Sequence, residues 1–216
     1  MKKFKLVELT RFRRNCDMTF ADFGNDDSYY PQNDRRKLLP SITFKVRVRD
    51  NSLEEVSSNP YSWKEVTTWD LFADKRVIIF SLPGAFTPTC SNKQLPDFDK
   101  LYHEFKDLGI DEIYCISVND SFVMNAWAKQ LDIKNVKIIP DGSGQFTERM
   151  GMSVMKDNFG FGIRSWRYAV IADNGKIEEW FIEPGMKDNS DLDPYGQTSP
   201  QNILDRLRNP QKDLPF

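Results

Sequence analysis

The sequence predicts an α/β domain whose central mixed β-sheet carries helices on both faces. Two near-continuous apolar runs, residues 76–82 and 112–118, have the composition of strands that are buried on both sides. Between them, residues 95–108 place apolar side chains at intervals of three and four, as one face of an amphipathic helix does. Further along, Asp-Asn-Gly at residues 173–175 joins two strand-like runs and predicts an antiparallel hairpin. Parallel strands with crossover helices plus this hairpin make a mixed sheet.

The other elements are expected in the following order. Residues 42–48 alternate polar and apolar side chains, as a half-exposed strand does. A helix begins near Cys90 and should bend or break at Pro96, because proline lacks an amide proton and clashes one turn back. The remaining strands are expected at residues 136–139, 167–172 and 177–182, and the remaining helices at residues 121–130, 145–150 and 200–208.

The chain length of 216 residues favours one domain with an appendage, because a single domain usually has roughly 100 to 200 residues. No linker separates two halves. Residues 1–39 show no sustained periodicity and are assigned to an N-terminal extension, and residues 40–216 form the domain. The extension starts with a basic stretch, which we interpret as a solvated arm rather than a transit peptide, although import into an organelle stays open.

Composition excludes several classes of protein. The 30 basic and 32 acidic side chains nearly cancel, so the total charge indicates neither a nucleic-acid nor a membrane partner. No run of about 18 apolar residues occurs, which argues against a transmembrane helix. The three cysteines, Cys16, Cys90 and Cys115, form no CxxC pair and suggest neither a disulfide framework nor a zinc site. A reducing, cytoplasmic location fits best.

The most informative stretch is PGAFTPTC at residues 83–90, which follows a buried strand and precedes a helix. A cysteine at a helix N-terminus is favoured as the reactive thiolate by unpaired backbone amides and the helix dipole. Prolines stiffen this loop and Gly84 permits a tight turn, so Thr87 can hold its hydroxyl at a fixed offset from the sulfur of Cys90. Such a site suits peroxide reduction to a sulfenic acid. The alternative is an inert core cysteine beside a helix-capping threonine.

The pattern Pro83-x-x-x-Thr87-x-x-Cys90 resembles the peroxiredoxins, and the string PGAFTPTCS resembles their type-five subfamily in particular. Further matches to that family cover about residues 40–210; they are SVND at 117–120, FVMNAW at 122–127, PDGSGQFT at 140–147 and RSWRY at 164–168. The resemblance implies a thioredoxin-like fold and a thiol peroxidase that reduces hydrogen peroxide and organic hydroperoxides in antioxidant defence and redox homeostasis.

The resemblance also implies roles for matched residues. Cys90 matches the peroxidatic cysteine, Thr87 the hydroxyl that binds thiolate and peroxide, and Pro83 the residue that shields the pocket. An arginine supplies a permanent cation, and the choice lies between Arg164 and Arg167. Three apart on an extended segment, the two would face opposite sides. The family arginine directly precedes an aromatic residue and a strand, which selects Arg167 and leaves Arg164 as an exposed charge at a strand end.

The resemblance to the peroxiredoxins also bears on how the sulfenic acid of Cys90 is reduced. Animal members carry a resolving cysteine after the last strand, and residues 183–200 here contain none. Cys115 lies in an apolar strand and is expected to be structural, while a resolving role for Cys16 is a minor alternative. The chain looks most like the peroxiredoxin half of bacterial peroxiredoxin-glutaredoxin fusions. This implies a one-cysteine cycle with glutathione and a separate glutaredoxin, with thioredoxin as a competing reductant, and a homodimer.

No cofactor or metal is expected beyond a thiol co-substrate. The one histidine, His103, is expected at a surface or packing position. The acidic residues 188–193 are expected to form a solvated loop, because they lack the spacing of a calcium loop. Two alternative functions would leave different signatures in the sequence. A holdase or binding module with the same fold would be marked by loss of Thr87, Cys90 or Arg167, and all three are present. A disulfide oxidoreductase would have a CxxC motif where this chain has Cys90-Ser-Asn-Lys93.

Overall fold

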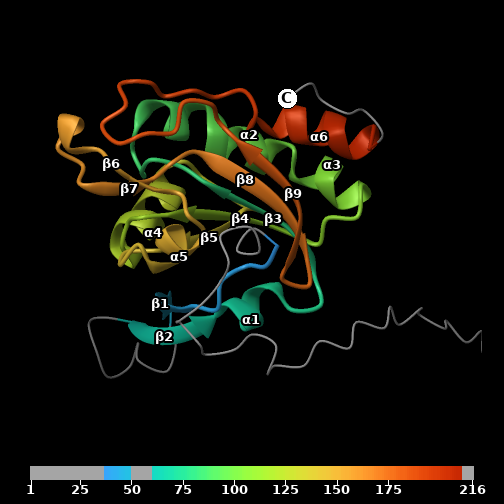
Figure 1. Cartoon of the computed structure of the whole chain (residues 1–216). Helices are drawn as coiled ribbons and strands as arrows, with labels where there is room; N and C mark the ends of the chain where they lie inside the picture. Colours follow the sequence, from blue (N-terminus) through green and yellow to red (C-terminus); the bar gives the residue numbers. More distant parts are fainter. Residues whose placement is uncertain (1–36, 50–59, 211–216) are drawn as a thin grey trace, which may run out of the picture. The chain divides into compact units, whose positions relative to one another are not determined.

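A five-stranded mixed sheet organises the fold (Figure 1). The computed structural model describes residues 37–49 and 60–210, and the statements below concern these residues. The strand order is β5-β4-β3-β8-β9. Three strands are parallel, namely β3 (Arg76–Ser81), β4 (Glu112–Ser117) and β5 (Lys137–Pro140). Two are antiparallel, namely β8 (Tyr168–Asp173) and β9 (Lys176–Ile182), which form the expected hairpin. The predicted mixed α/β sheet is therefore confirmed.

Helices cover both faces of this sheet, because its central strands are apolar on both sides. In β3, Ile78 and Phe80 point into one hydrophobic cluster, while Val77 and Ile79 point into the other, as the two-residue period of a strand requires. The first cluster is completed by α2 (Leu95–Lys100), α3 (Tyr102–Asp107), α4 (Ser121–Gln130) and α6 (Pro200–Arg208). The second is completed by β1 (Thr43–Arg49), α1 (Thr68–Phe72) and α5 (Gln145–Arg149).

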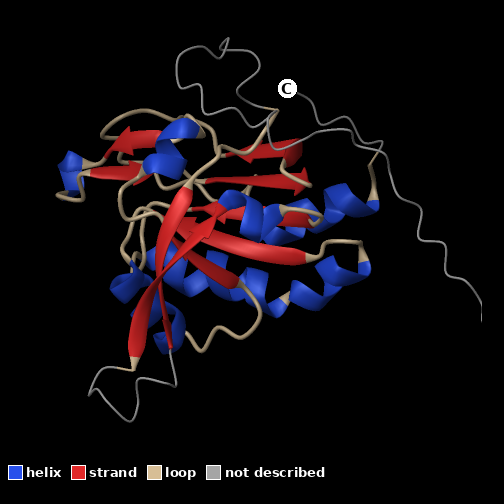
Figure 2. Cartoon of the chain, turned by 90° about the horizontal axis from the view of Figure 1, so that it is seen from below, coloured by secondary structure: helices blue, strands red, loops and turns tan. Residues whose placement is uncertain are grey.

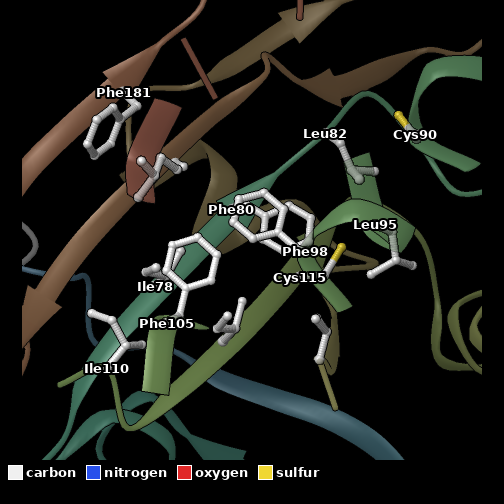
Figure 3. Close-up of a cluster of buried hydrophobic side chains, with 14 of the residues drawn as sticks. Ile78, Phe80, Leu82, Cys90, Leu95, Phe98, Phe105, Ile110, Cys115 and Phe181 are labelled. Atoms are coloured by element: carbon white, nitrogen blue, oxygen red, sulfur yellow. The ribbon is translucent and has the colours of Figure 1, made fainter. Parts of the chain in front are cut away.

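An aromatic stack fixes the helix that follows the Cys90 loop onto the sheet. The ring of Phe98 stacks on that of Phe80 with centroids 4.1 Å apart, and the ring of Phe105 stacks with that of Phe98 at a centroid distance of 5.9 Å. Figure 3 shows these three rings in the same cluster of buried side chains as Cys90. Truncating one fully buried phenylalanine typically costs about 3–5 kcal/mol, so this stack holds the start of the helix in one position relative to β3.

The helical segment from Pro88 to Asp107 differs from the expected single kink. Near its start, Cys90–Gln94 form a π-helical turn in which the amide of Leu95 donates to the carbonyl of Cys90. Pro96 lies at the start of α2, where its missing amide costs little. A second break occurs at Leu101, which leaves helical geometry with φ −92° and ψ 6°. The pattern of apolar residues did not reveal this second break because it continues unchanged across it.

Two small antiparallel pairs were missed by the sequence analysis. Strand β2 (Tyr61–Thr67) pairs with β1 as a twisted ribbon, seen in Figure 2. It is solvated along most of its length, so it shows no hydrophobic alternation. Strands β6 (Ser153–Met155) and β7 (Ile163–Ser165) form a short hairpin around the 3₁₀ turn η4 (Asp157–Phe159). Three-residue strands are too short to produce a periodic signal.

At its start, the described chain is attached to the edge of the sheet. Leu38 forms a bridge with Lys176, and the amide of Leu39 donates to the carbonyl of Gly175 at 2.9 Å. The predicted extension lies outside the described residues over 1–36, as does Cys16, and its boundary at residue 39 stays a prediction. No helix within the described ranges is both long enough and apolar enough to cross a membrane.

Candidate active site

Cys90 lies in the first turn of a helix that starts directly after the loop from β3. Helical geometry begins at Pro88, a position where proline is favoured because its fixed φ suits the first turn. The amide of Ser91 donates to the carbonyl of Thr87 at 3.0 Å and closes this turn. The side chain of Cys90 is fully buried. The local sequence therefore places Cys90 in the first turn of a helix, as expected.

The loop before Cys90 is tied to the end of the neighbouring strand. The amide of Ala85 donates to Oδ1 of Asn119 at 2.9 Å, and the Thr87 hydroxyl donates to the carbonyl of Gly84 at 2.9 Å. Between them, Phe86 adopts a left-handed φ of 65° with its ring exposed. A non-glycine residue in this region costs on the order of 1–3 kcal/mol, so the surrounding contacts must hold it. Pro83 is half-buried where the loop starts.

Arg167 is brought to the sulfur by the sheet. It directly precedes β8, whose first residue pairs with Ser81 at the end of β3, so it lies beside the strand end from which the Cys90 loop departs. Its Nη1 atom lies 3.5 Å from Sγ of Cys90. The same guanidinium donates to Oε1 of Gln94 and to Oδ1 of Asp193. Because Arg167 is only 1% exposed, its charge acts in a setting with little water.

The electrostatic balance keeps this arginine charged. Burial alone would lower the pKa of Arg167, but the negative charges of Cys90 and Asp193, together with their hydrogen bonds, raise it above its ordinary value. A guanidinium that cannot lose its proton offers a permanent cation to a thiolate and can address two oxygen or sulfur atoms at once.

Arg164 does not lie where the sequence analysis put it. It was expected to be an exposed charge, but it is half-buried on β7. Its Nη1 donates to the carbonyl of Val118 and its Nε to that of Phe161, both at 3.1 Å. A Cβ on Gly84 would lie 3.2 Å from Nη1, so the guanidinium packs against the active-site loop. The reason is that β7 and β8 are separate strands, and the chain bends between the two arginines.

The other candidate residues lie as follows. Cys115 is fully buried in β4, and burial, reinforced by the charge of Cys90, raises the pKa of its thiol well above the ordinary value. Figure 3 shows its sulfur among core side chains, apart from that of Cys90. His103 is exposed on α3. Over the described ranges, no cluster of histidine, cysteine or carboxylate side chains is arranged to hold a metal ion.

Two members of the site were missed from the sequence. Gln94 is fully buried one turn after Cys90 and accepts from Arg167, and a polar residue at that helical spacing could have been noticed. Asp193 belongs to the acidic run that was expected to be a solvated loop. That run is an exposed loop, and its last aspartate pairs with the guanidinium of the buried Arg167. No local sequence signal could have shown a contact with a residue 26 positions away in the chain.

Comparison with known proteins identifies the family. The chain matches the Redoxin family over residues 39–195. It is 62% identical over 174 residues to a peroxiredoxin of Rhizobium etli, which spans 81% of this chain and 96% of the relative. It is 46% identical over 171 residues to a hybrid peroxiredoxin of Haemophilus influenzae, which spans 79% of this chain and 65% of that protein. Among solved structures, the antioxidant protein of Plasmodium falciparum, a 1-Cys peroxiredoxin, superposes with a TM-score of 0.73 at 36% identity, over 81% of this chain and 99% of that chain.

These matches agree with the geometry around Cys90. The family match spans both the loop that carries this cysteine and the strand start that carries Arg167. The superposition over most of both chains confirms the thioredoxin-like fold that the resemblance implied. The chain therefore belongs to the peroxiredoxins, within the Redoxin family, and is a thiol peroxidase that reduces peroxides.

Proposed function

We propose that Cys90 is the peroxide-attacking residue of this peroxidase and that Arg167 is its permanent cation. The observation that carries this assignment is the 3.5 Å contact between Nη1 of Arg167 and the buried sulfur of Cys90. The thiolate sulfur attacks one peroxide oxygen, the O–O bond breaks, and the other oxygen leaves as water or an alcohol after taking a proton. Cys90 is then a sulfenic acid. Guanidinium donors stabilise the negative charge that develops on the departing oxygen.

Thr87 orients the peroxide in this proposal. Its hydroxyl proton is directed to the carbonyl of Gly84, so its oxygen keeps lone pairs that can accept the O–H of a hydroperoxide. Pro83, half-buried at the start of the same loop, limits the access of water to the sulfur of Cys90. The hydrogen bond from Ala85 to Asn119 and the packing of Arg164 hold this loop in place.

We further propose that an external thiol reduces the sulfenic acid in a one-cysteine cycle, with glutathione and glutaredoxin as the reductant. Among the described residues, the other cysteine is Cys115, which is fully buried in the central sheet and is not positioned to form a disulfide without unfolding β4. A resolving cysteine is thus not offered by this part of the chain. The relative in Plasmodium falciparum is a 1-Cys peroxiredoxin, which supports the same cycle here. Such a cycle needs a reducing compartment, and we place the enzyme in the cytoplasm.

A homodimer in which the active-site loops approach each other is also proposed. Phe86 supports it, because this ring is 48% exposed on the loop that leads to Cys90 and is held there at a strained φ of 65°. An exposed aromatic side chain in such a position suits a contact with a second copy of the chain. Sedimentation of the wild type and of Phe86→Ser tests this, with a shift to monomer expected in the variant.

The reductant is tested by following the consumption of hydrogen peroxide with glutathione plus glutaredoxin, and separately with thioredoxin plus its reductase. Wild type, Cys90→Ser and Cys16→Ser are compared. We expect turnover with the glutathione system that is lost in Cys90→Ser and kept in Cys16→Ser. Turnover with thioredoxin alone would replace the proposed reductant, and loss of turnover in Cys16→Ser would replace the one-cysteine cycle.

A further inference from the structure

Arg167 shares its charge between two negative groups. One end of the guanidinium, Nη1, contacts the sulfur of Cys90 at 3.5 Å and the amide oxygen of Gln94. The other end, Nη2, forms an ion pair with Asp193. The two partners of this pair differ in exposure, with Arg167 at 1% and Asp193 at 45%. A carboxylate at the surface is therefore connected to the reacting sulfur through a single buried cation.

The loop that carries Asp193 is held against the β6–β7 hairpin. It lies between β9 and α6 and has no regular secondary structure. Oδ1 of Asp188 accepts from the amide of Met155 at 2.8 Å, and the carbonyl of Ser190 accepts from Nζ of Lys156 at 2.7 Å. Lys156 is itself only 4% exposed. These bonds fix the loop just before Asp193, so its carboxylate reaches Arg167 without a large loss of conformational freedom.

Two cations lie near the carboxylate of Asp193. Arg167 faces it directly, and Lys156 lies close enough for the charges of Asp193 and Asp191 to act on it. Burial lowers the pKa of Lys156, and these two carboxylates oppose that shift. Asp193 therefore stands next to one fully buried cation and near a second one.

We propose that Asp193 is a positioning residue that fixes the Arg167 guanidinium and, by sharing its charge, limits the stabilisation that Arg167 gives to the Cys90 thiolate. This inference rests on the proposed roles of Cys90 and Arg167. The carboxylate of Asp193 has two separate effects in this role. Its oxygen accepts a hydrogen bond from Arg167 and keeps the guanidinium in place. Its negative charge disfavours a second negative charge on the sulfur of Cys90.

Two substitutions of Asp193 distinguish the effect of its hydrogen bond from the effect of its charge. Asp193→Asn keeps an oxygen acceptor for Nη2 but removes the charge, whereas Asp193→Ala removes both. Asp191→Asn is the matched control, because it removes a charge of the same sign from the same loop, where Asp191 accepts from Nδ2 of Asn158. Two rates are measured for each variant: alkylation of Cys90 by iodoacetamide across a pH series, which reports the thiolate, and reaction with hydrogen peroxide in a single turnover, which also needs an ordered guanidinium.

In Asp193→Asn, we expect alkylation at mildly acidic pH to be about threefold to tenfold faster than in Asp191→Asn, because an ordered cation then faces the sulfur alone. Its peroxide rate should stay within about threefold of the wild type, since a more acidic thiol is also a weaker nucleophile. In Asp193→Ala, the peroxide rate should fall at least about tenfold, because small misplacements of a positioned group are costly. Thermal unfolding verifies that each variant is folded.

The proposal is overturned if Asp193→Asn is alkylated no faster than Asp191→Asn, or if Asp193→Ala reduces peroxide as fast as Asp193→Asn. If the proposed role of Cys90 were wrong, the same assay would give a different result. In that case Cys90→Ser, included in the same single-turnover assay, would react with peroxide at the wild-type rate, whatever the Asp193 variants did.

Discussion

The guanidinium of Arg167 lies 3.5 Å from the sulfur of Cys90, although 77 positions separate the two residues in the chain. The antiparallel pairing of β8 with β3 produces this contact. Tyr168 is opposite Ser81, so Arg167, which directly precedes β8, lies beside the end of β3 from which the Cys90 loop departs. The cation is therefore placed by the core of the sheet rather than by a surface loop, and a site on such a rigid element needs no rearrangement before peroxide arrives.

Replacing Arg167 by lysine should remove most of the peroxide reactivity while leaving the fold intact. Lysine keeps the charge but lacks the planar fork that reaches Cys90, Gln94 and Asp193 together. We expect the second-order rate with hydrogen peroxide to fall by about 10²-fold or more, the usual effect of losing one donor to a developing oxyanion. Stopped-flow measurement of this rate for the wild type and Arg167→Lys tests the prediction. Arg208→Lys, which alters an exposed pair with Glu104, is the control and should retain the wild-type rate.

Arg164 should support the active-site loop without touching the sulfur. Arg164→Ala removes two hydrogen bonds to carbonyls and the packing against Gly84. Hydrogen bonds from a charged donor contribute about 1.5–3 kcal/mol each, so the free energy of unfolding should fall by at least about 2 kcal/mol. The peroxide rate should fall by about tenfold, because the loop that carries Thr87 is less well fixed. Urea unfolding and the same stopped-flow assay measure both effects. A variant with wild-type stability and rate would contradict the supporting role.

Cys115 should be dispensable for catalysis but not for stability. Its side chain fills a fully buried position in β4, and its raised thiol pKa leaves it unreactive at neutral pH. Cys115→Ala should therefore lower the free energy of unfolding by about 1–3 kcal/mol through the cavity it leaves, with peroxide turnover unchanged at a temperature where the protein is folded. Loss of turnover in a folded Cys115→Ala protein would instead give this thiol a part in the cycle.

The stability of the protein should fall in alkaline solution partly because of Tyr168. Burial, reinforced by the nearby Asp141, raises the pKa of this phenol above its ordinary value. A raised pKa in the folded state contributes stability that is fully present below the ordinary tyrosine pKa of about 10 and is lost as the pH rises above it. Tyr168→Phe should therefore show a shallower loss of stability at high pH. Chemical unfolding across a pH series tests this, and equal slopes for the variant and the wild type would refute it. Tyr61→Phe, at an exposed position, is the control.

The features predicted from sequence were those with local causes. The apolar runs around Ile78 and Cys115 predicted buried parallel strands, and Asp-Asn-Gly predicted the hairpin. The position of residues 83–90 between a buried strand and an amphipathic helix predicted that Cys90 lies at a helix start. By contrast, Arg164 was misplaced because its environment depends on a bend between β7 and β8 that has no sequence signal. The ion pair of Asp193 with Arg167 was missed for a similar reason, since an acidic residue in a polar loop usually has no buried partner.

The most direct test of the central claim is to treat the reduced protein with one equivalent of hydrogen peroxide in the presence of a diketone that traps sulfenic acids, and to locate the adduct by peptide mass spectrometry. Wild type, Cys90→Ser and Cys115→Ser are compared. The proposed mechanism predicts an adduct on Cys90 in the wild type and in folded Cys115→Ser, and no adduct together with lost peroxide consumption in Cys90→Ser. Peroxide consumption by Cys90→Ser at the wild-type rate, with the adduct on another cysteine, would contradict it.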